Sequence, residues 1–320
     1  MKKWFVFILV LLALDSFSQD KVLYLQNEYI KAGFLPDVGG RMVFLAPEGE
    51  SNFLLSDSAL WNESQSERVE LKADTPFKPY NGFISWVGPQ SAWWTKQDIL
   101  PKKKEGADVW PPDPFLIYSN FEVIEHTNNL LVLQGTESPV SGVQLIKKYE
   151  LDGNSIKIEV TAKNIRKNTI EWDLWSNSRF PAFSNFRVPV DSEEQIRIDA
   201  KENGFVDIVK YKFENGYFTF IPELPAGEKK QRISKAFIYP STGDIQVQRG
   251  DWKLDINFEK VPLEKIHPEQ ALIEVYNCIT SNGLNNVLEL EHHSAYQTIK
   301  PGEAIKLKEV WTFEKKPAQN

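Results

Sequence analysis

Residues 151–164 read LDGNSIKIEVTAKN, and this stretch decides the fold class. Apolar and polar side chains alternate along it, which is the period-two pattern of a strand with one buried face. The apolar positions are Ile156, Ile158, Val160 and Ala162. The preceding Asp-Gly-Asn is a turn sequence. The same alternation returns in residues 252–259 and 305–313, where Glu309 is the exception, and further turn sequences lie at 214–216, 241–244 and 300–303.

Composition points to the same class of fold. The 320 residues are 42% hydrophobic and 12% aromatic, which is enough apolar surface for a large core. Long helical periodicity is absent, and the best helix candidate is about Ser58 to Lys72. The sequence has no repeat of fixed period, which disfavours a propeller or a solenoid. We therefore predict an all-β fold, a large antiparallel β-sandwich with few short helices and less than about one fifth helix.

Charge and motifs exclude several classes of function. With 37 Lys and Arg against 44 Asp and Glu, the net charge of −7 disfavours a nucleic-acid partner. The single cysteine, Cys278, cannot form an internal disulfide or a thiolate cluster. There is no P-loop, G-x-S-x-G elbow, H-E-x-x-H, Rossmann fingerprint or calcium-loop motif, so we expect neither a cofactor nor a metal. A two-carboxylate glycosidase stays open, because sequence cannot measure the carboxylate separation.

The N-terminus has the pattern of a secretory signal peptide. Lys2 and Lys3 precede an apolar run from Trp4 to Leu14, and Ser-Phe-Ser then precedes Gln19. We assign residues 1–18 to the signal and 19–320 to a single domain. No later apolar stretch approaches the length of a membrane span. We expect an exported monomer, located in a bacterial periplasm, with no integral membrane segment after cleavage.

Residues 76–115 break the strand pattern. Their Pro and Gly density argues against a continuous central strand. The segment also holds four tryptophans, and a long loop rich in indoles is typical of a functional site. The alternative is that the indoles plug one end of the sandwich as core. These tryptophans are Trp86, Trp93, Trp94 and Trp110.

Three stretches together resemble the galactose mutarotase-like, or aldose 1-epimerase-like, supersandwich family. The first is FLPDVGGRM at 34–42, followed by SNFLL at 51–55. The second is the strand, Gly, long strand, turn and strand rhythm of 130–164. The third is VLELEHHSAYQTIKPGEAIKLKEVWTF at 287–313. The Gly-Phe-x-x-Trp-x-Gly-Pro-Gln block at 82–90 and Trp-Pro-Pro-Asp-Pro at 110–114 look closer to an uncharacterised bacterial branch.

The resemblance implies a sugar-facing cleft. In mutarotases a Glu of the late strand is the general base on the anomeric hydroxyl, and a His of the central sheet protonates the ring oxygen. The late strand here offers Glu289 and Glu291, which face the same side of a regular strand. Spacing does not decide between them, and both could instead be solvent-facing carboxylates.

The expected His is missing, because residues 172–179 read WDLWSNSR. On a regular strand His293 lies on the same side as Glu289 and Glu291, whereas His292 would lie there only after a bulge. Either histidine could supply the acid, or it could lie at the surface. Sugar contacts could come from the indoles and from polar side chains that share a strand face with Trp175. We name Asn177 and Arg179 for this, and add Arg41 of the Gly-Gly turn, whose alternative is a structural ion pair.

Three hypotheses follow for the function. The first is a carbohydrate-binding protein, for mono- or oligosaccharides, on a mutarotase-like fold. The second is an aldose epimerase-like enzyme that uses a Glu base and a non-standard acid. The third is a structural envelope protein whose tryptophans are only core. The first two differ in whether Glu289 or Glu291 lies near a His in the cleft, and the third predicts that no tryptophan lines an open concavity.

Overall fold

The computed structural model describes residues 21–63, 68 and 70–316. The predicted signal peptide therefore lies outside the described residues. Strands dominate the described chain, and its α-helices are only four or five residues long: α1 (Ser58–Trp61), α2 (Pro101–Glu105) and α3 (Pro114–Ile117). Three single turns of 3₁₀-helix lie at Gln90–Ala92, Glu193–Gln195 and Leu263–Lys265. No helix in the described ranges is both long and apolar enough to cross a membrane.

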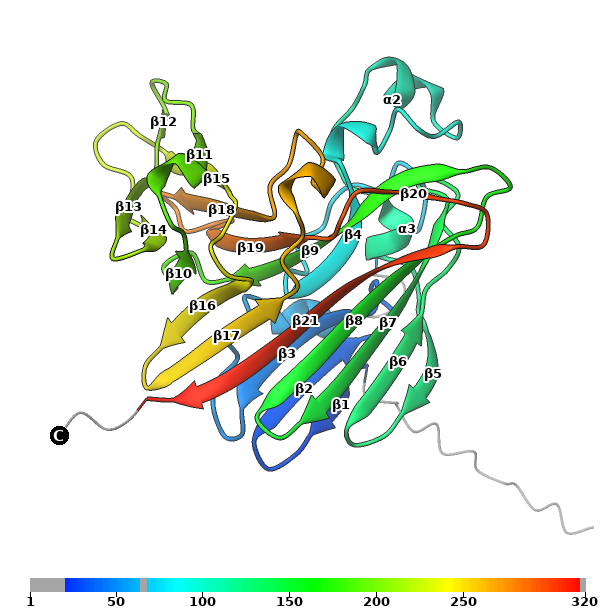
Figure 1. Ribbon diagram of the computed structural model, residues 1–320, viewed down its shortest axis with the longest axis horizontal. Coiled ribbons are helices and arrows are strands. Elements are labelled where there is room, and N and C mark those ends of the chain that lie inside the picture. Colours follow the sequence, from blue (N-terminus) through cyan, green and yellow to red (C-terminus); the bar gives the residue numbers. More distant parts are fainter. Residues whose placement is uncertain (1–20, 64–67, 69, 317–320) are drawn as a thin grey trace, which may run out of the picture.

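The strands form two large sheets (Figure 1). The first has 11 strands. Across the sheet they run β1 (Leu23–Gln26), β2 (Ile30–Leu35), β3 (Arg41–Pro47), β4 (Phe83–Gly88), β9 (Ile170–Phe180), β19 (Val287–His293), β18 (Ile273–Thr280), β15 (Gln231–Ile238) and β11 (Ile196–Asp199), with β12 (Val206–Asp207) beside β15 and β20 (Gln297–Ile299) beside β9.

The second sheet has 10 strands. Its order is β13 (Lys210–Glu214), β14 (Tyr217–Ile221), β10 (Asn185–Pro189), β16 (Asp244–Arg249), β17 (Trp252–Phe258), β21 (Ala304–Lys315), β8 (Ser155–Asn164), β7 (Val143–Asp152), β6 (Leu130–Gln134) and β5 (Glu122–His126). Its long central strands, β7, β8 and β21, have strictly alternating burial along most of their length, because one face meets the first sheet and the other faces water.

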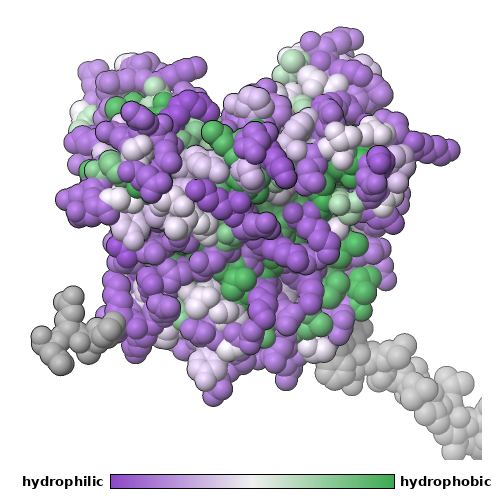
Figure 2. Space-filling model, viewed as in Figure 1, coloured by the Kyte–Doolittle hydropathy of each residue, from purple (hydrophilic) through white to green (hydrophobic). Residues whose placement is uncertain are grey.

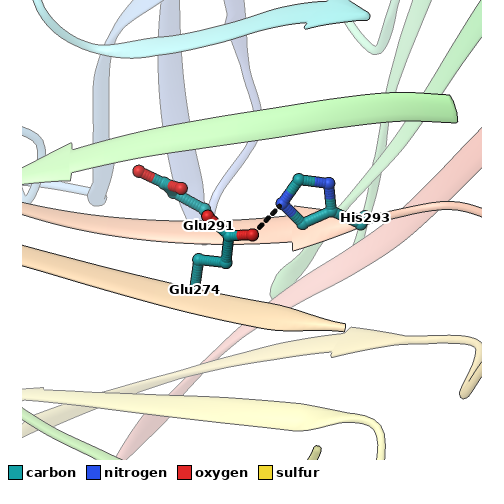
Figure 3. A group of neighbouring side chains, drawn as sticks. All are labelled: Glu274, Glu291 and His293. Atoms are coloured by element: carbon teal, nitrogen blue, oxygen red, sulfur yellow. Dashed lines mark ion pairs between the residues drawn. The ribbon is translucent and has the colours of Figure 1, made fainter. Parts of the chain in front are cut away.

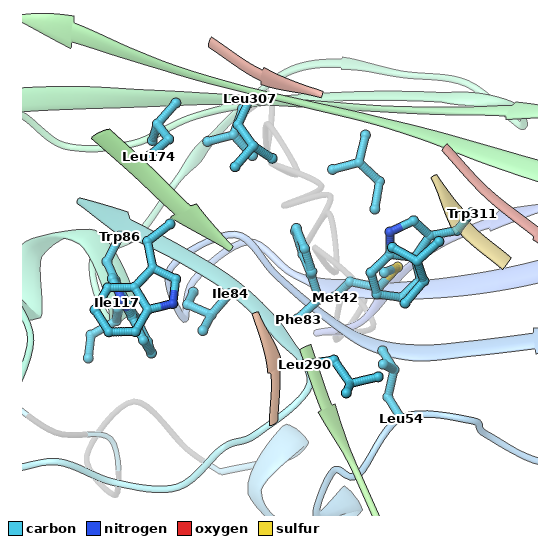
Figure 4. Close-up of a cluster of buried hydrophobic side chains, with 14 of the residues drawn as sticks. Met42, Leu54, Phe83, Ile84, Trp86, Ile117, Leu174, Leu290, Leu307 and Trp311 are labelled. Atoms are coloured by element: carbon cyan, nitrogen blue, oxygen red, sulfur yellow. The ribbon is translucent and has the colours of Figure 1, made fainter. Parts of the chain in front are cut away.

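The core lies between the two sheets. Figure 4 shows Leu307 and Trp311 of β21 packed toward side chains of the first sheet. The Trp311 ring meets Phe83 edge to face, with 5.5 Å between ring centroids, and stacks on Phe180 of β9 at 6.4 Å. A single hydrophobic cluster therefore joins both sheets.

The predicted fold class is confirmed. The alternating stretches of the sequence are β8, β17 and β21, and every pairing between described strands is antiparallel except β12 with β15. The expected helix from Ser58 to Lys72 is wrong in length, since α1 ends at Trp61 and residues 70–72 are not helical. Asp57 caps α1 through the backbone N–H of Ala59, but no apolar face follows to extend it.

The prediction for residues 76–115 also needs correction. Within this segment β4 is a central strand of the first sheet, and all six of its residues are buried. Prolines flank β4 at Pro79 and Pro89 without interrupting it. Proline density therefore bounds this strand and does not exclude it, because only a proline inside the strand would remove a donor from the ladder.

The Gly-Gly-Arg turn is held by two buried donors of β7. Gly39 and Gly40 both have positive φ, 72° and 57°. Lys147 donates to the carbonyl oxygen of Gly39 at 2.7 Å, and the Tyr149 hydroxyl donates to that of Gly40 at 3.1 Å. Burial lowers the pKa of Lys147 well below its ordinary value, which favours the neutral amine. A neutral amine still donates an N–H to the carbonyl. These bonds tie the connection between β2 and β3 of the first sheet to β7 of the second sheet.

We predict that Gly39→Ala destabilises the protein much more than Gly153→Ala. Both glycines have positive φ, 72° and 56°, so each alanine suffers the same left-handed backbone cost of about 1 kcal/mol. A Cβ at Gly39 would lie 2.4 Å from the carbonyl oxygen of Ile117, whereas a Cβ at Gly153 meets nothing within 4 Å. Urea unfolding should give a loss of about 3 kcal/mol or more for Gly39→Ala. Equal losses for the two variants would contradict the packing argument.

Candidate functional site

The centre of the first sheet is buried on both faces, although only one face meets the second sheet. Ten of the eleven residues of β9 are buried, as is all of β4. The outer face is covered by residues 89–118, which carry α2 and α3, and by the connection between β18 and β19. Two-sided burial of this kind requires that other segments cover the outer face of the sheet.

Strand register brings the polar side chains of this outer face together. One row across the sheet consists of residues that pair strand by strand. It runs from Arg179 of β9 to Glu289 of β19, Tyr276 of β18 and Lys235 of β15. In the neighbouring row Asn177 pairs with Glu291 and then Glu274. Directly opposite residues on one face have neighbouring side chains, so both rows point the same way.

A cavity of about 840 Å³ lies over these rows. Figure 2 shows the surface hollowed between two projections, which Figure 1 identifies as the β11–β15 region and the segment with α2. The cavity is lined by apolar and polar groups from at least six elements: Leu55, Asp57, Leu60, Phe77, Pro79, Asn81, Trp86, Gln90, Trp93, Trp110, Trp175, Arg179, Lys235, Tyr276, Cys278, Gly283, Asn285, Asn286, Val287, Glu289 and Glu291.

One wall of the cavity is aromatic. Trp93 stacks on Trp175 with 5.8 Å between ring centroids, and Trp86 meets both rings edge to face. Trp110 continues the wall, 6.5 Å from Trp93 and 4.9 Å from Phe77. Each indole holds its neighbour in place, so the wall is rigid before any ligand arrives.

The floor of the cavity carries an ion pair. Arg179 Nη2 lies 2.8 Å from Glu289 Oε1, and its Nη1 and Nε donate to the side chains of Asn81 and Asn177. These bonds use three of the five N–H groups of the guanidinium, so two remain to donate to a ligand. The Asn177 amide donates to both Glu289, at 3.0 Å, and Glu291, at 3.2 Å.

The two carboxyl groups differ in protonation. Burial works against ionisation of Glu289, but Arg179 and Asn177 outweigh it and lower the pKa of this carboxyl. Burial raises the pKa of Glu291 well above its ordinary value, and the nearby carboxylates of Glu274 and Glu289 add to the rise against the attraction of Lys235. A hydrogen bond joins the two groups. The two carboxyl groups therefore titrate as a pair, in which a shared proton is favoured on Glu291 and the negative charge on Glu289.

Lys235 connects this pair to a deeper polar network. Its Nζ lies 2.5 Å from Glu274 Oε2 and 3.1 Å from Glu291 Oε2. Burial disfavours the ammonium, but both carboxyl groups outweigh this and the pKa of Lys235 is raised, so the group stays charged. Behind Glu274, His293 Nε2 lies 3.4 Å from Oε1 and His293 Nδ1 lies 3.1 Å from Asp173 Oδ2.

This network includes the strongest candidate for a metal site in the described ranges. Figure 3 shows Glu274, Glu291 and His293 converging, and their ligand atoms all lie within 4.8 Å of one another. The ammonium of Lys235 already lies between the two carboxyl groups. A metal ion would have to displace this ammonium, so the donor set as folded fits a lysine better than a metal.

Most of the residues singled out in the sequence lie on the cavity. Seven of them line it: Trp86, Trp93, Trp110, Trp175, Arg179, Glu289 and Glu291. Asn177 lies directly beneath, bonded to both carboxyl groups. His293 is fully buried beside Trp175, at 4.8 Å between ring centroids, and does not line the cavity. Its contact with the site runs through Glu274.

Arg41 and Trp94 lie elsewhere. Arg41 donates to the backbone carbonyls of Asn81 and Ile117, and burial lowers its pKa to about 10. Its bonds hold the segments on either side of β4, which is a structural role. Trp94 is fully buried and donates to the carbonyl of Pro111. The two residues therefore support the covering segment and do not face the cavity.

Sequence reasoning missed four contributors to the site: Lys235, Glu274, Asn81 and Phe77. Lys235 and Glu274 lie on strands whose polar residues look like ordinary solvent-facing positions. Asn81 has a positive φ of 57° and precedes a glycine, which signals a tight turn but not its position beside Arg179. Only the pairing of distant strands identifies these residues.

A second buried polar cluster lies between the sheets. Glu309 accepts hydrogen bonds from Ser176, at 2.5 Å, and Trp311, at 2.7 Å, and its Oε1 lies 3.1 Å from His292 Nδ1. His292 therefore points away from the cavity, and burial lowers its pKa. This explains why Glu309 interrupts the apolar face of the last strand, since its carboxylate meets partners there.

Comparison with known proteins agrees with this architecture. The family described as Domain of unknown function (DUF4380) matches residues 21–314. The chain belongs to this family. No functionally curated protein matches its sequence significantly.

Solved structures match over nearly the whole chain. The Slr1438 protein of Synechocystis sp. PCC 6803 is 12% identical, with a TM-score of 0.55 over 93% of this chain and 97% of that one. A galactose mutarotase-like protein of Lactobacillus casei ATCC 334 is 11% identical, with 0.52 over 92% and 100%. A putative mutarotase (YeaD) of Salmonella typhimurium is 13% identical, with 0.51 over 92% and 90%. The DUF4380 chain thus has the galactose mutarotase-like fold, as the sequence resemblance implied.

We predict that Glu289→Gln and Glu291→Gln change stability in opposite directions at pH 7. The pKa of Glu291 is higher in the folded protein than in the unfolded chain, where it is about 4.3. Its contribution to the free energy of unfolding is therefore fully present below the unfolded pKa and is lost as the pH rises through the folded pKa. Glutamine avoids that loss, so Glu291→Gln should gain stability over the wild type between pH 4 and pH 7. The lowered pKa of Glu289 has the opposite sign, and its stabilisation is lost as the pH falls through the folded value.

Urea unfolding at several pH values tests both variants, with the exposed Glu264→Gln as the matched control. At pH 7, Glu289→Gln should be less stable than the wild type by up to about 3 kcal/mol, because Arg179 loses its anionic partner. Both differences should shrink toward pH 4. Changes of the same sign, or changes independent of pH, would contradict the assignment of proton and charge.

Proposed function

We propose that this DUF4380 chain is an exported carbohydrate-binding protein whose sugar site is the cavity over β9 and β19. The observation that carries the proposal is the presence of an indole wall and a charged hydrogen-bonding floor in one cavity. A pyranose has apolar C–H faces and a rim of hydroxyls, so it needs aromatic rings beside directed donors and acceptors. The signal-peptide pattern of residues 1–18 supports export.

Each group in the cavity suits a part of a sugar. Trp110 offers the most exposed indole surface for C–H contacts, and Trp93 and Trp175 line the cavity beside it. The two remaining N–H groups of Arg179 can donate to hydroxyl oxygens, and the anionic Glu289 can accept from hydroxyl hydrogens. Lys235 adds a further cationic donor, held over Trp175 at 4.9 Å from the ring centroid.

We predict that Arg179→Lys weakens sugar binding by about 1.5–3 kcal/mol, the scale of a hydrogen bond to a charged group. Lysine keeps the positive charge beside Glu289 but lacks the planar fork that also reaches Asn81 and Asn177. Calorimetric titration with galactose, glucose and mannose, on the wild type, this variant and a Phe205→Ala control outside the cavity lining, measures the loss. Failure of every sugar to bind the folded wild type would refute a carbohydrate site.

A second candidate, an aldose epimerase-like enzyme, is favoured by the unequal pair of carboxyl groups. Anomer interconversion needs a base to remove the proton of the anomeric hydroxyl and an acid to protonate the ring oxygen as the ring C–O bond breaks. Rotation of the open-chain aldehyde and the reverse proton transfers close the ring with the opposite configuration. Glu289, with its lowered pKa, is suited to be the base, and Glu291, whose raised pKa favours the protonated form, is suited to be the acid in place of the missing histidine.

We predict for this candidate that Glu289→Gln and Glu291→Gln each abolish enzyme-dependent mutarotation of galactose and glucose, while Glu264→Gln does not. Polarimetry, corrected for the spontaneous rate, provides the measurement. The rate should rise with pH through the folded pKa of Glu289, below its ordinary value, and fall through that of Glu291, above it. Sugar binding without any increase in the mutarotation rate would support the binding function and refute the enzymatic one.

A further inference from the structure

Trp110 differs from the other indoles of the cavity. Trp86, Trp93 and Trp175 are 3%, 2% and 4% exposed, whereas Trp110 is 47% exposed. A large aromatic ring that is half exposed and lines a cavity can stack against the apolar face of a ligand that enters the cavity. The exposed surface of Trp110 is therefore the part of the aromatic wall that the fold itself does not use.

A further aromatic ring, that of Phe77, contacts both Trp110 and the charged floor. Phe77 lies between them, 4.9 Å from Trp110 by ring centroids and 5.1 Å from the Arg179 guanidinium carbon. A single sugar unit that contacts Arg179 and Glu289 would pack over Phe77 and leave Trp110 uncovered. A second unit, linked to the first, is what would reach the Trp110 ring.

The size and outer lining of the cavity agree with more than one sugar unit. Its volume of about 840 Å³ lies in the upper part of the range of about 300–1,000 Å³ for pockets that hold drug-sized ligands. The lining continues beyond the floor to Gln90, beside Trp110, and to Asn285 and Asn286 in the connection between β18 and β19. Amide side chains of this kind donate to and accept from hydroxyls.

We propose that the site binds an oligosaccharide, with one unit on the charged floor and the next stacked on Trp110. The proposal rests on the carbohydrate-binding function proposed above and specifies its ligand class. In this arrangement the contact with Trp110 strengthens the binding of a longer chain, while Arg179 and Glu289 bind the first sugar unit. Because the indole is already held by Phe77 and Trp93, little ordering is needed when the second unit binds.

The experiment compares monosaccharides with tetrasaccharides of the same sugar. Calorimetric titrations use galactose against β-1,4-galactotetraose, glucose against cellotetraose and maltotetraose, and mannose against β-1,4-mannotetraose. The proteins are the wild type, Trp110→Ala, Trp110→Phe and the control Phe205→Ala, which removes an aromatic ring 61% exposed outside the cavity lining. Circular dichroism and intrinsic fluorescence check that each variant is folded.

We expect at least one tetrasaccharide to bind the wild type about tenfold more tightly than its monosaccharide, the scale of one good ring contact. Trp110→Ala should remove this gain, so that the tetrasaccharide and its monosaccharide bind this variant with similar dissociation constants, and Trp110→Phe should keep most of the gain. Phe205→Ala should bind as the wild type does.

Two results would overturn the oligosaccharide proposal, and only the second would also refute the carbohydrate-binding function. If monosaccharides bind but chain length brings no gain, or the gain survives in Trp110→Ala, the oligosaccharide site is wrong and the carbohydrate site stands. If no sugar of either length binds the folded wild type, the carbohydrate function itself is wrong, and the role of Trp110 falls with it.

Discussion

The candidate site depends on the antiparallel register between β9 and β19. This register places Glu289 opposite Arg179 and Glu291 opposite Asn177. A slip of one residue would turn every one of these side chains to the opposite face, where the hydrophobic core lies. The inner face makes such a slip costly, because His292 and Leu290 of β19 must meet their partners between the sheets. Core packing on one face therefore holds the chemistry on the other.

Burying so many ionisable groups is tolerable here because their charges are paired and shared. Glu289 is matched by Arg179, Lys235 is matched by Glu274, and the remaining carboxyl, Glu291, has a raised pKa that favours its neutral form. An isolated charge in this environment would cost several kcal/mol, so each substitution that removes a partner affects its neighbours as well. The same balance sets the chemistry, since it shifts the pKa values of two hydrogen-bonded carboxyl groups in opposite directions.

The aromatic wall has two functions within the molecule. Trp86, Trp93 and Trp175 stack against one another and join the core, so the alternative that the indoles are only core is correct for most of their surface. They still line the cavity and lower its local dielectric, which strengthens the charge interactions on the floor. Core and site are thus two faces of the same side chains, and Trp110 is the member of the wall left substantially uncovered.

The sequence by itself determined the strands and the sides on which their residues lie. Period-two alternation in β8, β17 and β21 is a local property of the chain, and the same period places Glu289, Glu291 and His293 on one face. Tertiary structure alone decided which of these side chains meet a cavity. Lys235 and Glu274 join the site through pairings of β15, β18 and β19, and Arg41 is withdrawn from it by bonds to backbone carbonyls far along the chain. Local pattern fixes orientation relative to a strand, whereas neighbours across a sheet depend on contacts between segments distant in sequence, which no local pattern records.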